Sequence, residues 1–396
     1  MKRYLVALLS VFLLLCVVGG QGKSLNAPPM ERDQPRSAAS PLFIYALDIG
    51  QGDSLLIVSP TGKTVLIDTG DAGNEQNVLS ALINHAGGKK IDLFIASHPH
   101  ADHIGVAAEV IKDTTVAKVL DSGFPHTTKT YERYLLAIKD SGAQYIQAVP
   151  GQTFDIGGGA VISVLAPIKP YFTKSELRPG ATEPNANSAV VRLDYKNFSM
   201  LFTGDAEAET EARMIASNAN LKARVLKVGH HGSRYATSDA FLRAVHPEAA
   251  VISVGSANNY GHPTQDALDR LKNAGVKVYR TDLQGEIKIT SDGSTYRIDT
   301  QKAASLAAIF IGRVARETSK GPSATPAPSN TTPAANGAPL SDATASGLII
   351  GNKNSKKYHL PNCPSYSQTL EKNRVYFKSA AEAEAAGYTR AGNCPK

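Results

Sequence analysis

Side chains that bind metal ions are concentrated in one short segment of the chain. His98, His100, Asp102 and His103 fall within six positions, in the pattern His-x-His-x-Asp-His, directly after the apolar run Ile91–Ala96. Imidazole and carboxylate groups within reach of one another suit zinc, manganese or iron. A single buried histidine usually makes only a hydrogen bond, but four such groups in six positions are hard to explain in that way. The segment therefore predicts a metal site.

Further loops carry compatible groups, and most of them follow an apolar run. Asp68 could orient a histidine ligand by accepting a hydrogen bond from it. Asp205 could bridge two cations, or it could cap the helix that we expect to start near Ala206. In the adjacent pair His230 and His231, the second histidine could instead make only a structural hydrogen bond. These loops predict that the metal site draws on several parts of the chain.

The elements that must position these residues alternate between strands and helices. Short β-branched runs predict strands at 42–47, 54–58, 64–67, 91–96, 160–165, 188–194, 199–203, 225–228, 250–254, 276–279 and 286–290. Amphipathic segments predict helices at 78–85, 104–111, 131–141, 206–217, 238–245 and 265–273, and a short helix at 306–314. So many strands with interspersed helices predict two sheets packed face to face, with the helices outside.

The loop sequences resemble the metallo-β-lactamase superfamily, and more closely the extracellular hydrolase domain of ComEC-type competence proteins. The resemblance covers about residues 42–300 and implies an α/β fold, a four-layer αββα sandwich with the metals at the strand ends. The motifs that carry it are Asp48–Ser54, Leu66–Gly70, Ser97–Gly105, Leu201–Glu207, Leu226–Ser233 and Tyr260–Pro263.

The resemblance also implies one or two divalent metal ions, Zn²⁺ or Mn²⁺. One ion would be held by His98, His100 and Asp205, and the second by Asp102, His103, Asp205 and His230. Many members of the superfamily place a further histidine where this chain has Asn187. The first site would then be one ligand short, which favours manganese or a labile zinc.

The function implied is that of an exported nuclease, a phosphodiesterase that attacks DNA through a metal-bound hydroxide. We expect catalytic roles for Asp102, Asp68, His262 and His231, and substrate contacts from Asn187, Lys227, Ser233 and Arg234. Two alternatives stay open. One is a metallo-hydrolase acting on an amide, ester or thioester, including a β-lactam. The other is a surface DNA-binding protein without catalysis.

The two ends of the chain differ in composition from its middle. A basic start and a short apolar run predict a signal peptide at 1–20, and export from a bacterial cell. An uncleaved leader or lipid anchor at Cys16 is the alternative. We expect a flexible lead-in at 21–41, the hydrolase domain at 42–312, a linker rich in Pro, Ala, Ser and Thr at 313–347, and a small α+β module at 348–396.

The net charge of +7 does not lie on the predicted hydrolase domain. Residues 43–300 hold 25 basic and 28 acidic side chains, whereas residues 349–396 hold 8 and 3. The basic tail could therefore add affinity for DNA. Its aromatic residues, which include Tyr358 and Phe377, could stack on bases or could equally form its core.

Cys363 and Cys394 lie 31 positions apart in this tail and predict a disulfide. A zinc site is the alternative, but only His359 is close by. The tail resembles the metal-binding module of the Ada DNA-repair protein, which uses four cysteines, in Gly351–His359 and in the positions of both cysteines.

Overall fold

The computed structural model describes residues 40–313, 349–360, 363, 373–377, 379–392 and 394. The chain divides into two compact units, Met1–Lys320 and Gly321–Lys396. The predicted leader lies outside the described residues, and so does nearly all of the lead-in and the linker, so the proposed domain boundaries stay predictions. Among the described residues, no helix has the length and apolar character needed to cross a membrane.

The first sheet of the large unit has eight strands, in the order β17-β16-β1-β2-β3-β5-β7-β8. In chain order they are β1 (Leu42–Ala46), β2 (Leu55–Val58), β3 (Thr64–Ile67), β5 (Leu93–Ala96), β7 (Lys118–Asp121), β8 (Gln144–Gln147), β16 (Ile287–Ser291) and β17 (Tyr296–Thr300). Three helices cover its outer face, namely α1 (Glu75–Ala86), α3 (Ala107–Asp113) and α4 (Lys129–Ser141).

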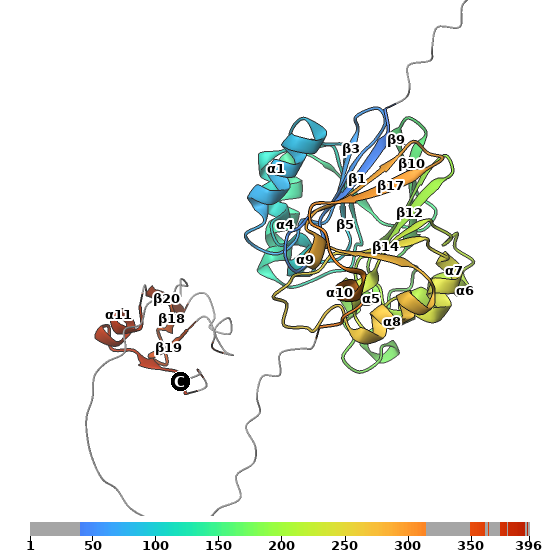
Figure 1. Ribbon diagram of the computed structural model, residues 1–396. Coiled ribbons are helices and arrows are strands. Elements are labelled where there is room, and N and C mark those ends of the chain that lie inside the picture. Colours follow the sequence, from blue (N-terminus) through green and yellow to red (C-terminus); the bar gives the residue numbers. More distant parts are fainter. Residues whose placement is uncertain are drawn as a thin grey trace, which may run out of the picture. The chain divides into compact units, whose positions relative to one another are not determined.

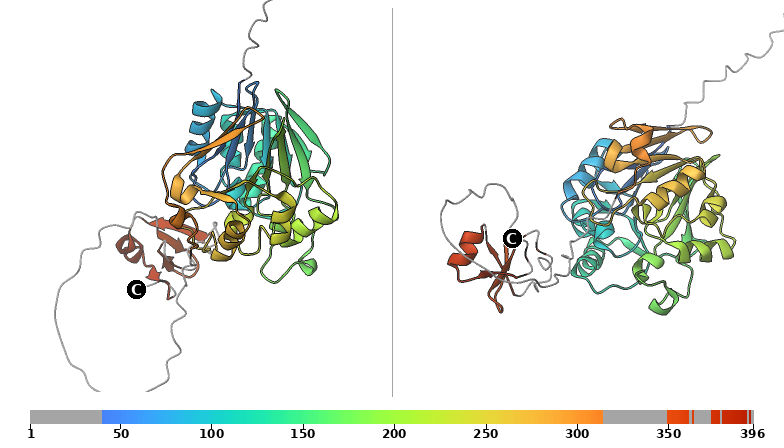
Figure 2. Two further views of the ribbon diagram at one scale, coloured as in Figure 1. Left: turned by 45° about the vertical axis from the view of Figure 1, so that its right-hand side comes forward. Right: turned by 60° about the horizontal axis from the view of Figure 1, so that its bottom comes forward.

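The second sheet has seven strands, in the order β15-β14-β13-β12-β11-β10-β9. They are β9 (Thr153–Gly157), β10 (Ala160–Ala166), β11 (Val190–Tyr195), β12 (Phe198–Phe202), β13 (Val225–Lys227), β14 (Ala249–Ile252) and β15 (Lys277–Arg280). Its outer helices are α6 (Ala208–Ala216), α7 (Asp239–Val245) and α8 (Gln265–Asn273). Figures 1 and 2 show the two sheets between the two helical layers.

Successive side chains of a strand point to opposite faces of its sheet, and this alternation explains why the two sheets stack. In β2, Leu55 and Ile57 belong to the core between the sheets, whereas Leu56 and Val58 pack under the helices. A strand covered on both faces is apolar throughout, as β2 is. Burying each such side chain contributes roughly 1.5–3 kcal/mol. The layers are helix, sheet, sheet and helix, which confirms the predicted αββα fold.

Several short elements complete the large unit and sit mostly in its loops. They are β4 (Lys90–Ile91), β6 (Thr115–Val116), α2 (Ala101–Ile104), η1 (Lys174–Glu176), α5 (Glu183–Ala186), η2 (Gly229–Gly232), α9 (Thr281–Gln284) and α10 (Leu306–Ile309). The single helix predicted at 104–111 is wrong, because the chain forms α2 and α3 there, separated at Gly105 and Val106. Gly105 packs against the backbone of Asp71 so closely that a side chain would not fit.

The C-terminal unit is a small sheet with one helix. Its strands run in the order β20-β18-β19-β21, and its elements are β18 (Ile349–Asn352), β19 (Lys357–His359), β20 (Arg374–Phe377), α11 (Ala380–Ala385) and β21 (Thr389–Arg390). Tyr358 and Phe377 are buried in its core, so they are not free to stack on bases. Cys363 and Cys394 form a disulfide, as predicted.

Candidate metal centre

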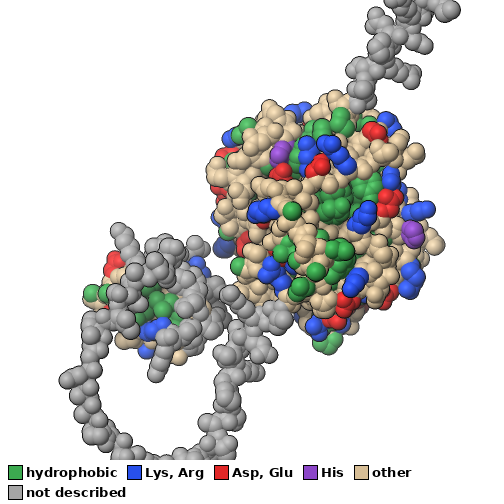
Figure 3. All heavy atoms as spheres, viewed as in Figure 1, with side chains coloured by type: hydrophobic (Ala, Val, Ile, Leu, Met, Phe, Trp, Pro, Cys, Tyr) green, Lys and Arg blue, Asp and Glu red, His purple; other side chains and the backbone are tan. Residues whose placement is uncertain are grey.

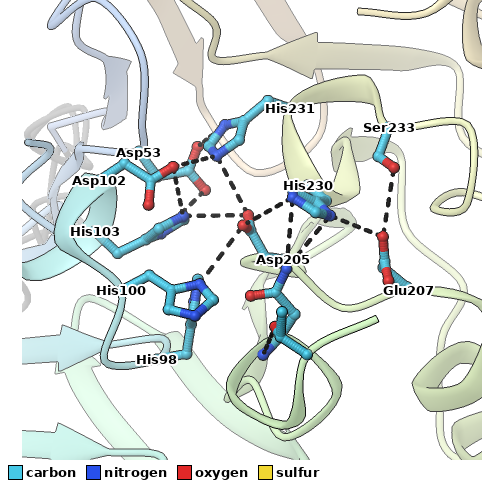
Figure 4. Close-up of polar contacts among 12 residues, drawn as sticks. Asp53, His98, His100, Asp102, His103, Asp205, Glu207, His230, His231 and Ser233 are labelled. Carbon is cyan, nitrogen blue, oxygen red and sulfur yellow. Dashed lines mark hydrogen bonds and ion pairs between the residues drawn. The ribbon is translucent and has the colours of Figure 1, made fainter. Parts of the chain in front are cut away.

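Loops at the carboxyl ends of four strands bring the predicted metal ligands together (Figure 4). In the first sheet, Asp68 follows β3, and the segment from His98 to His103 follows β5 and enters α2. In the second sheet, Asp205 follows β12, and His230 and His231 follow β13 in η2. The strands of each pair are parallel, so their carboxyl ends lie at the same edge of the sheet.

The backbone is strained where these loops turn. Asp68, His230 and His231 adopt left-handed φ angles of 57°, 44° and 52°. Such conformations cost about 1–3 kcal/mol each for residues other than glycine, and they concentrate at functional sites.

One group of donor atoms comprises His98, His100 and Asp205. One ligand atom from each lies within 4.8 Å of the others. The distance from His98 Nε2 to Asp205 Oδ2 is 3.7 Å, and His98 Nε2 lies 3.0 Å from His100 Nδ1. These are the three residues that we expect at the first metal.

A second group shares Asp205 and adds Asp102, His103 and His231. His103 Nε2 lies 3.2 Å from Asp205 Oδ1, and His231 Nε2 lies 3.4 Å from the same oxygen and 3.3 Å from Asp102 Oδ2. The two imidazole nitrogens and Asp205 Oδ1 are buried and make no hydrogen bond to any described residue. Buried polar atoms that converge without hydrogen bonds fit a divalent cation between them.

Polar partners behind the histidines fix which nitrogen faces the cation position. His103 Nδ1 lies 2.8 Å from Asp68 Oδ2, and the backbone N–H of Ser97 donates to Asp68 Oδ1 at 2.7 Å. His231 Nδ1 donates to the carbonyl oxygen of Ser253 at 2.9 Å. In both histidines Nε2 is thereby left for a metal, which is the arrangement typical of metal-binding histidines.

The structure therefore brings His231, rather than His230, to the second group. His230 Nε2 is 3.6 Å from Asp205 Oδ2, but its Nδ1 lies 2.8 Å from Glu207 Oε1. We accordingly revise the expected ligand set and propose His231 for the second metal, with His230 beside it. Glu207, which sequence reasoning missed, also pairs with Arg178.

Asp53 is a second buried acid whose role the sequence pattern does not predict. It forms an ion pair with Lys227, and its Oδ1 lies 3.4 Å from His231 Nδ1. Both members of the pair are essentially inaccessible to solvent. Lys227 therefore lies beneath the metal position, where it cannot contact a substrate.

The other predicted substrate contacts divide between the cavity and its surroundings. Ser233 and His262 line the cavity beside the metal position. Asn187 does not line the cavity, because its buried amide is hydrogen-bonded to backbone atoms of Phe172 and Glu183. Asn185 lines the cavity instead. Arg234 does not line the cavity either, and it pairs with Asp266 on the surface.

Asp205 does not cap the following helix, because α6 begins only at Ala208, with Glu207 at its N-cap position. The alternative that Asp205 serves as a helix cap is therefore wrong. The carboxylate of Asp205 lies instead at the centre of the two donor groups (Figure 4).

The pKa values of two histidines are consistent with a binding site for cations. Burial alone would lower the pKa of His231, but Asp205, Asp102 and Asp53 outweigh burial and raise the pKa to about 10. Burial would likewise lower the pKa of His103, yet the surrounding carboxylates raise it well above 6.5. Both shifts have the same cause, which is that the buried carboxylates favour positive charge at these positions. Divalent cations would supply the same positive charge.

The cavity over the donor groups has a volume of about 640 Å³. Two exposed tyrosines stand on its rim, Tyr235 with 47% and Tyr260 with 65% of its surface accessible. The guanidinium of Arg178 lies 3.5 Å from the centre of the Tyr235 ring, and Tyr260 is stacked near His262. The cavity therefore combines a metal-binding floor with an aromatic and cationic rim.

Comparison with known protein families shows to which family the chain belongs. The family described as the metallo-beta-lactamase superfamily matches residues 47–256, which is more than half of the 396 residues. The chain belongs to the metallo-β-lactamase superfamily. It has the hydrolase fold of that superfamily, whose site binds one or two divalent metals, and both donor groups described above lie within the matched segment.

Curated relatives of this superfamily member include ComE operon protein 3 of Bacillus subtilis, which is 32% identical over 274 residues, 62% of this chain and 34% of the relative. Competence protein ComA of Neisseria gonorrhoeae is 32% identical over 243 residues, 61% of this chain and 31% of the relative. The predicted resemblance to ComEC-like competence proteins is thus confirmed. The chain spans about a third of the length of these relatives.

Among solved structures, the metallo-beta-lactamase fold protein YhfI from Bacillus subtilis matches with a TM-score of 0.40 and 14% identity, over 60% of this chain and 95% of that one. In the tail, the family described as ArfC matches residues 323–390. The resemblance of the tail to the Ada module stays a prediction.

Proposed function

We propose that this superfamily member is a metal-dependent phosphodiesterase that cleaves nucleic acid, with DNA as its substrate. The observation that carries the proposal is the pair of donor groups that share Asp205 at the floor of an open cavity whose rim presents Arg178, Tyr235 and Tyr260. Two cations held close together can polarise a phosphodiester and activate water. Exposed aromatic rings beside them can stack on bases.

The site itself is negatively charged. It can therefore bind an anionic substrate once the metal ions are in place. Asp53, Asp68, Asp102 and Asp205 are clustered at the site, and the predicted hydrolase domain has no excess of basic residues. On the face shown in Figure 3, basic and acidic side chains are interspersed over the large unit. A phosphate would therefore be attracted by the bound cations, because residues 43–300 as a whole carry no excess of basic side chains.

The chain's own residues have separable tasks in this proposal. Asp68 holds the His103 ring at 2.8 Å, and Ser253 holds the His231 ring at 2.9 Å, so both rings keep Nε2 toward the reacting centre. His262 also lines the cavity, where it can donate a hydrogen bond to a phosphate oxygen. Burial and the neighbouring His230 and His231 lower the pKa of His262 to about 3, so its ring is neutral and donates from one nitrogen only.

The names of the relatives support DNA as the polymer. One curated relative is named as a competence protein and another as a recombination protein, and they match this chain over 61% and 70% of its length. We further propose that the chain is exported through its apolar N-terminal run, residues 1–20. The N-terminal sequence of the protein recovered from a bacterial culture medium or periplasm would test this proposal.

The decisive experiment is incubation of the purified chain with plasmid DNA and Mn²⁺ or Zn²⁺. We expect cleavage by the parent chain and none by His100→Ala, which removes a ligand from the first donor group. His246→Asn is the matched control, because this exposed histidine lies at the end of α7, outside the cavity. Intact DNA with both metals would refute the nuclease proposal. Hydrolysis of a chromogenic β-lactam by the same preparation would favour an amide hydrolase instead.

A further inference from the structure

The C-terminal unit holds a second set of metal-binding side chains that the proposed function does not use. His359, Cys363 and Cys394 each place one nitrogen or sulfur atom within 4.8 Å of the others. All three are buried, with 9%, 5% and 8% of their surface accessible. The two sulfurs are bonded to each other as a disulfide.

One nitrogen of the His359 imidazole makes no hydrogen bond to a described residue. This nitrogen, Nδ1, is buried and has no partner among the described residues of the unit. Leaving a buried polar atom unsatisfied costs about 1–3 kcal/mol. The disulfide relieves little of this cost, because its sulfurs carry no hydrogen to donate and are only weak acceptors. The nitrogen is therefore available as a ligand.

The backbone holds both cysteines in place independently of the sulfur–sulfur bond. Cys363 N–H donates to the carbonyl of Leu360 at 2.9 Å, and Cys394 N–H donates to the carbonyl of Ala391 at 3.0 Å. The N–H of Leu360 also donates to Cys363 Sγ at 2.8 Å. A donor at that distance stabilises a thiolate. If the disulfide opened, the two sulfurs would thus remain beside His359.

We propose that reduction of the Cys363–Cys394 disulfide creates a binding site for a thiophilic cation, with Zn²⁺ as the test ion. A dithiol reductant supplies two electrons and two protons, yielding two cysteine thiols and its own disulfide. Zn²⁺ then displaces the two thiol protons and binds two thiolates and His359 Nδ1. Two sulfur ligands and one nitrogen are a typical protein ligand set for zinc, and the fourth position is left to water or another ligand.

This site would act as a redox-dependent crosslink. The disulfide ties the segment around Cys363 to the segment around Cys394 when the chain is oxidised, and the cation ties the same segments when it is reduced. The inference is independent of the proposed function, because it uses none of the residues around the catalytic cavity.

The test uses the full chain carrying Cys16→Ser, so that the only thiols after reduction are those of Cys363 and Cys394. Bound Zn²⁺ is counted per chain before and after treatment with a phosphine, which becomes a phosphine oxide and competes weakly for zinc. We expect one additional Zn²⁺ per reduced chain. With Co²⁺, we expect a sulfur-to-cobalt charge-transfer band only after reduction, since the cavity of the large unit offers cobalt no sulfur.

His359→Ala should weaken the additional zinc at least tenfold, whereas His246→Asn should leave it unchanged. Formation of the disulfide in oxidised His359→Ala, measured by mass spectrometry, verifies that the unit still folds. Two free thiols without an additional zinc or a charge-transfer band would overturn the proposal. So would equally tight binding by the parent chain and His359→Ala.

Discussion

At the scale of single residues, the buried ion pair of Lys227 and Asp53 makes the folded state sensitive to one substitution. Burial would raise the pKa of Asp53, but Lys227, together with His231 and His103, holds the pKa below its ordinary value. Lys227→Met leaves this carboxylate without its main partner, so we expect the free energy of unfolding to fall by about 3–5 kcal/mol. Denaturant unfolding with a chelator present measures this loss without a contribution from bound metal.

The double variant Lys227→Met with Asp53→Asn is the control for this prediction, because it removes both charges together. It should recover much of the lost stability. A single Lys227→Met variant whose free energy of unfolding stays within about 1 kcal/mol of the parent would contradict the assigned role of the pair.

The rim tyrosines give a second prediction at the residue scale, which rests on the proposed function. Each of Tyr235→Ala and Tyr260→Ala should weaken the binding of a single-stranded oligonucleotide by roughly 1–3 kcal/mol, because one stacking surface is removed. Hydrolysis of a small phosphodiester without bases should not change. Steady-state kinetics on both substrates measures the difference, and Tyr235→Phe, which keeps the ring, should behave like the parent. Equal losses on both substrates would argue against stacking.

The residues that the sequence predicts and those it misses differ in a physical way. The His98–His103 segment is compact enough for its chemistry to be read from residue types and spacing alone. The choice between His230 and His231 cannot be predicted in that way, because both rings lie near Asp205 and they differ in the partner of Nδ1, which is the Glu207 carboxylate for His230 and the Ser253 carbonyl for His231. Asp53 and Glu207 are missed because their partners, Lys227 and Arg178, are remote in the sequence.

At the scale of elements, the loop from β1 to β2 supports the metal site as well as joining two strands. Gly52 has a φ of 119°, and a Cβ there would collide with the carbonyl oxygen of Asp102. We expect Gly52→Ala to displace the Asp102 loop and lower metal affinity by more than tenfold. Gly62→Ala is the matched control, since its φ is 82° but a Cβ would meet no atom. Titration of metal into both variants measures the effect, and equal affinities would contradict it.

The strands that the sequence does not predict lie at or near the sheet edges. β8 and β17 end the first sheet, and β9 ends the second. Residues of β8 are exposed or half-buried, and β17 alternates between half-buried and exposed, so neither forms an apolar run. Central strands such as β2 are apolar throughout because they are covered on both faces. The pattern of apolar residues therefore predicts the central strands of each sheet better than its edge strands.

At the scale of the whole molecule, the separation of charge between the two units predicts separate contributions to DNA binding. The tail from residue 349 carries a net charge of +5, and Lys353, Lys356 and Lys357 are exposed on it. Removal of residues 321–396 should weaken DNA binding and flatten the dependence of log K on log salt, by about 0.9 for each phosphate that the tail no longer neutralises.

Cleavage of a small phosphodiester should survive this truncation, because the donor groups and the cavity lie wholly in the first unit. Replacing Lys353, Lys356 and Lys357 by glutamine in the full chain separates the effect of charge from that of the tail's bulk. It should reproduce part of the decrease in slope. Binding measured at several salt concentrations tests both changes. An unchanged affinity and slope after truncation would assign DNA binding to the metal cavity alone.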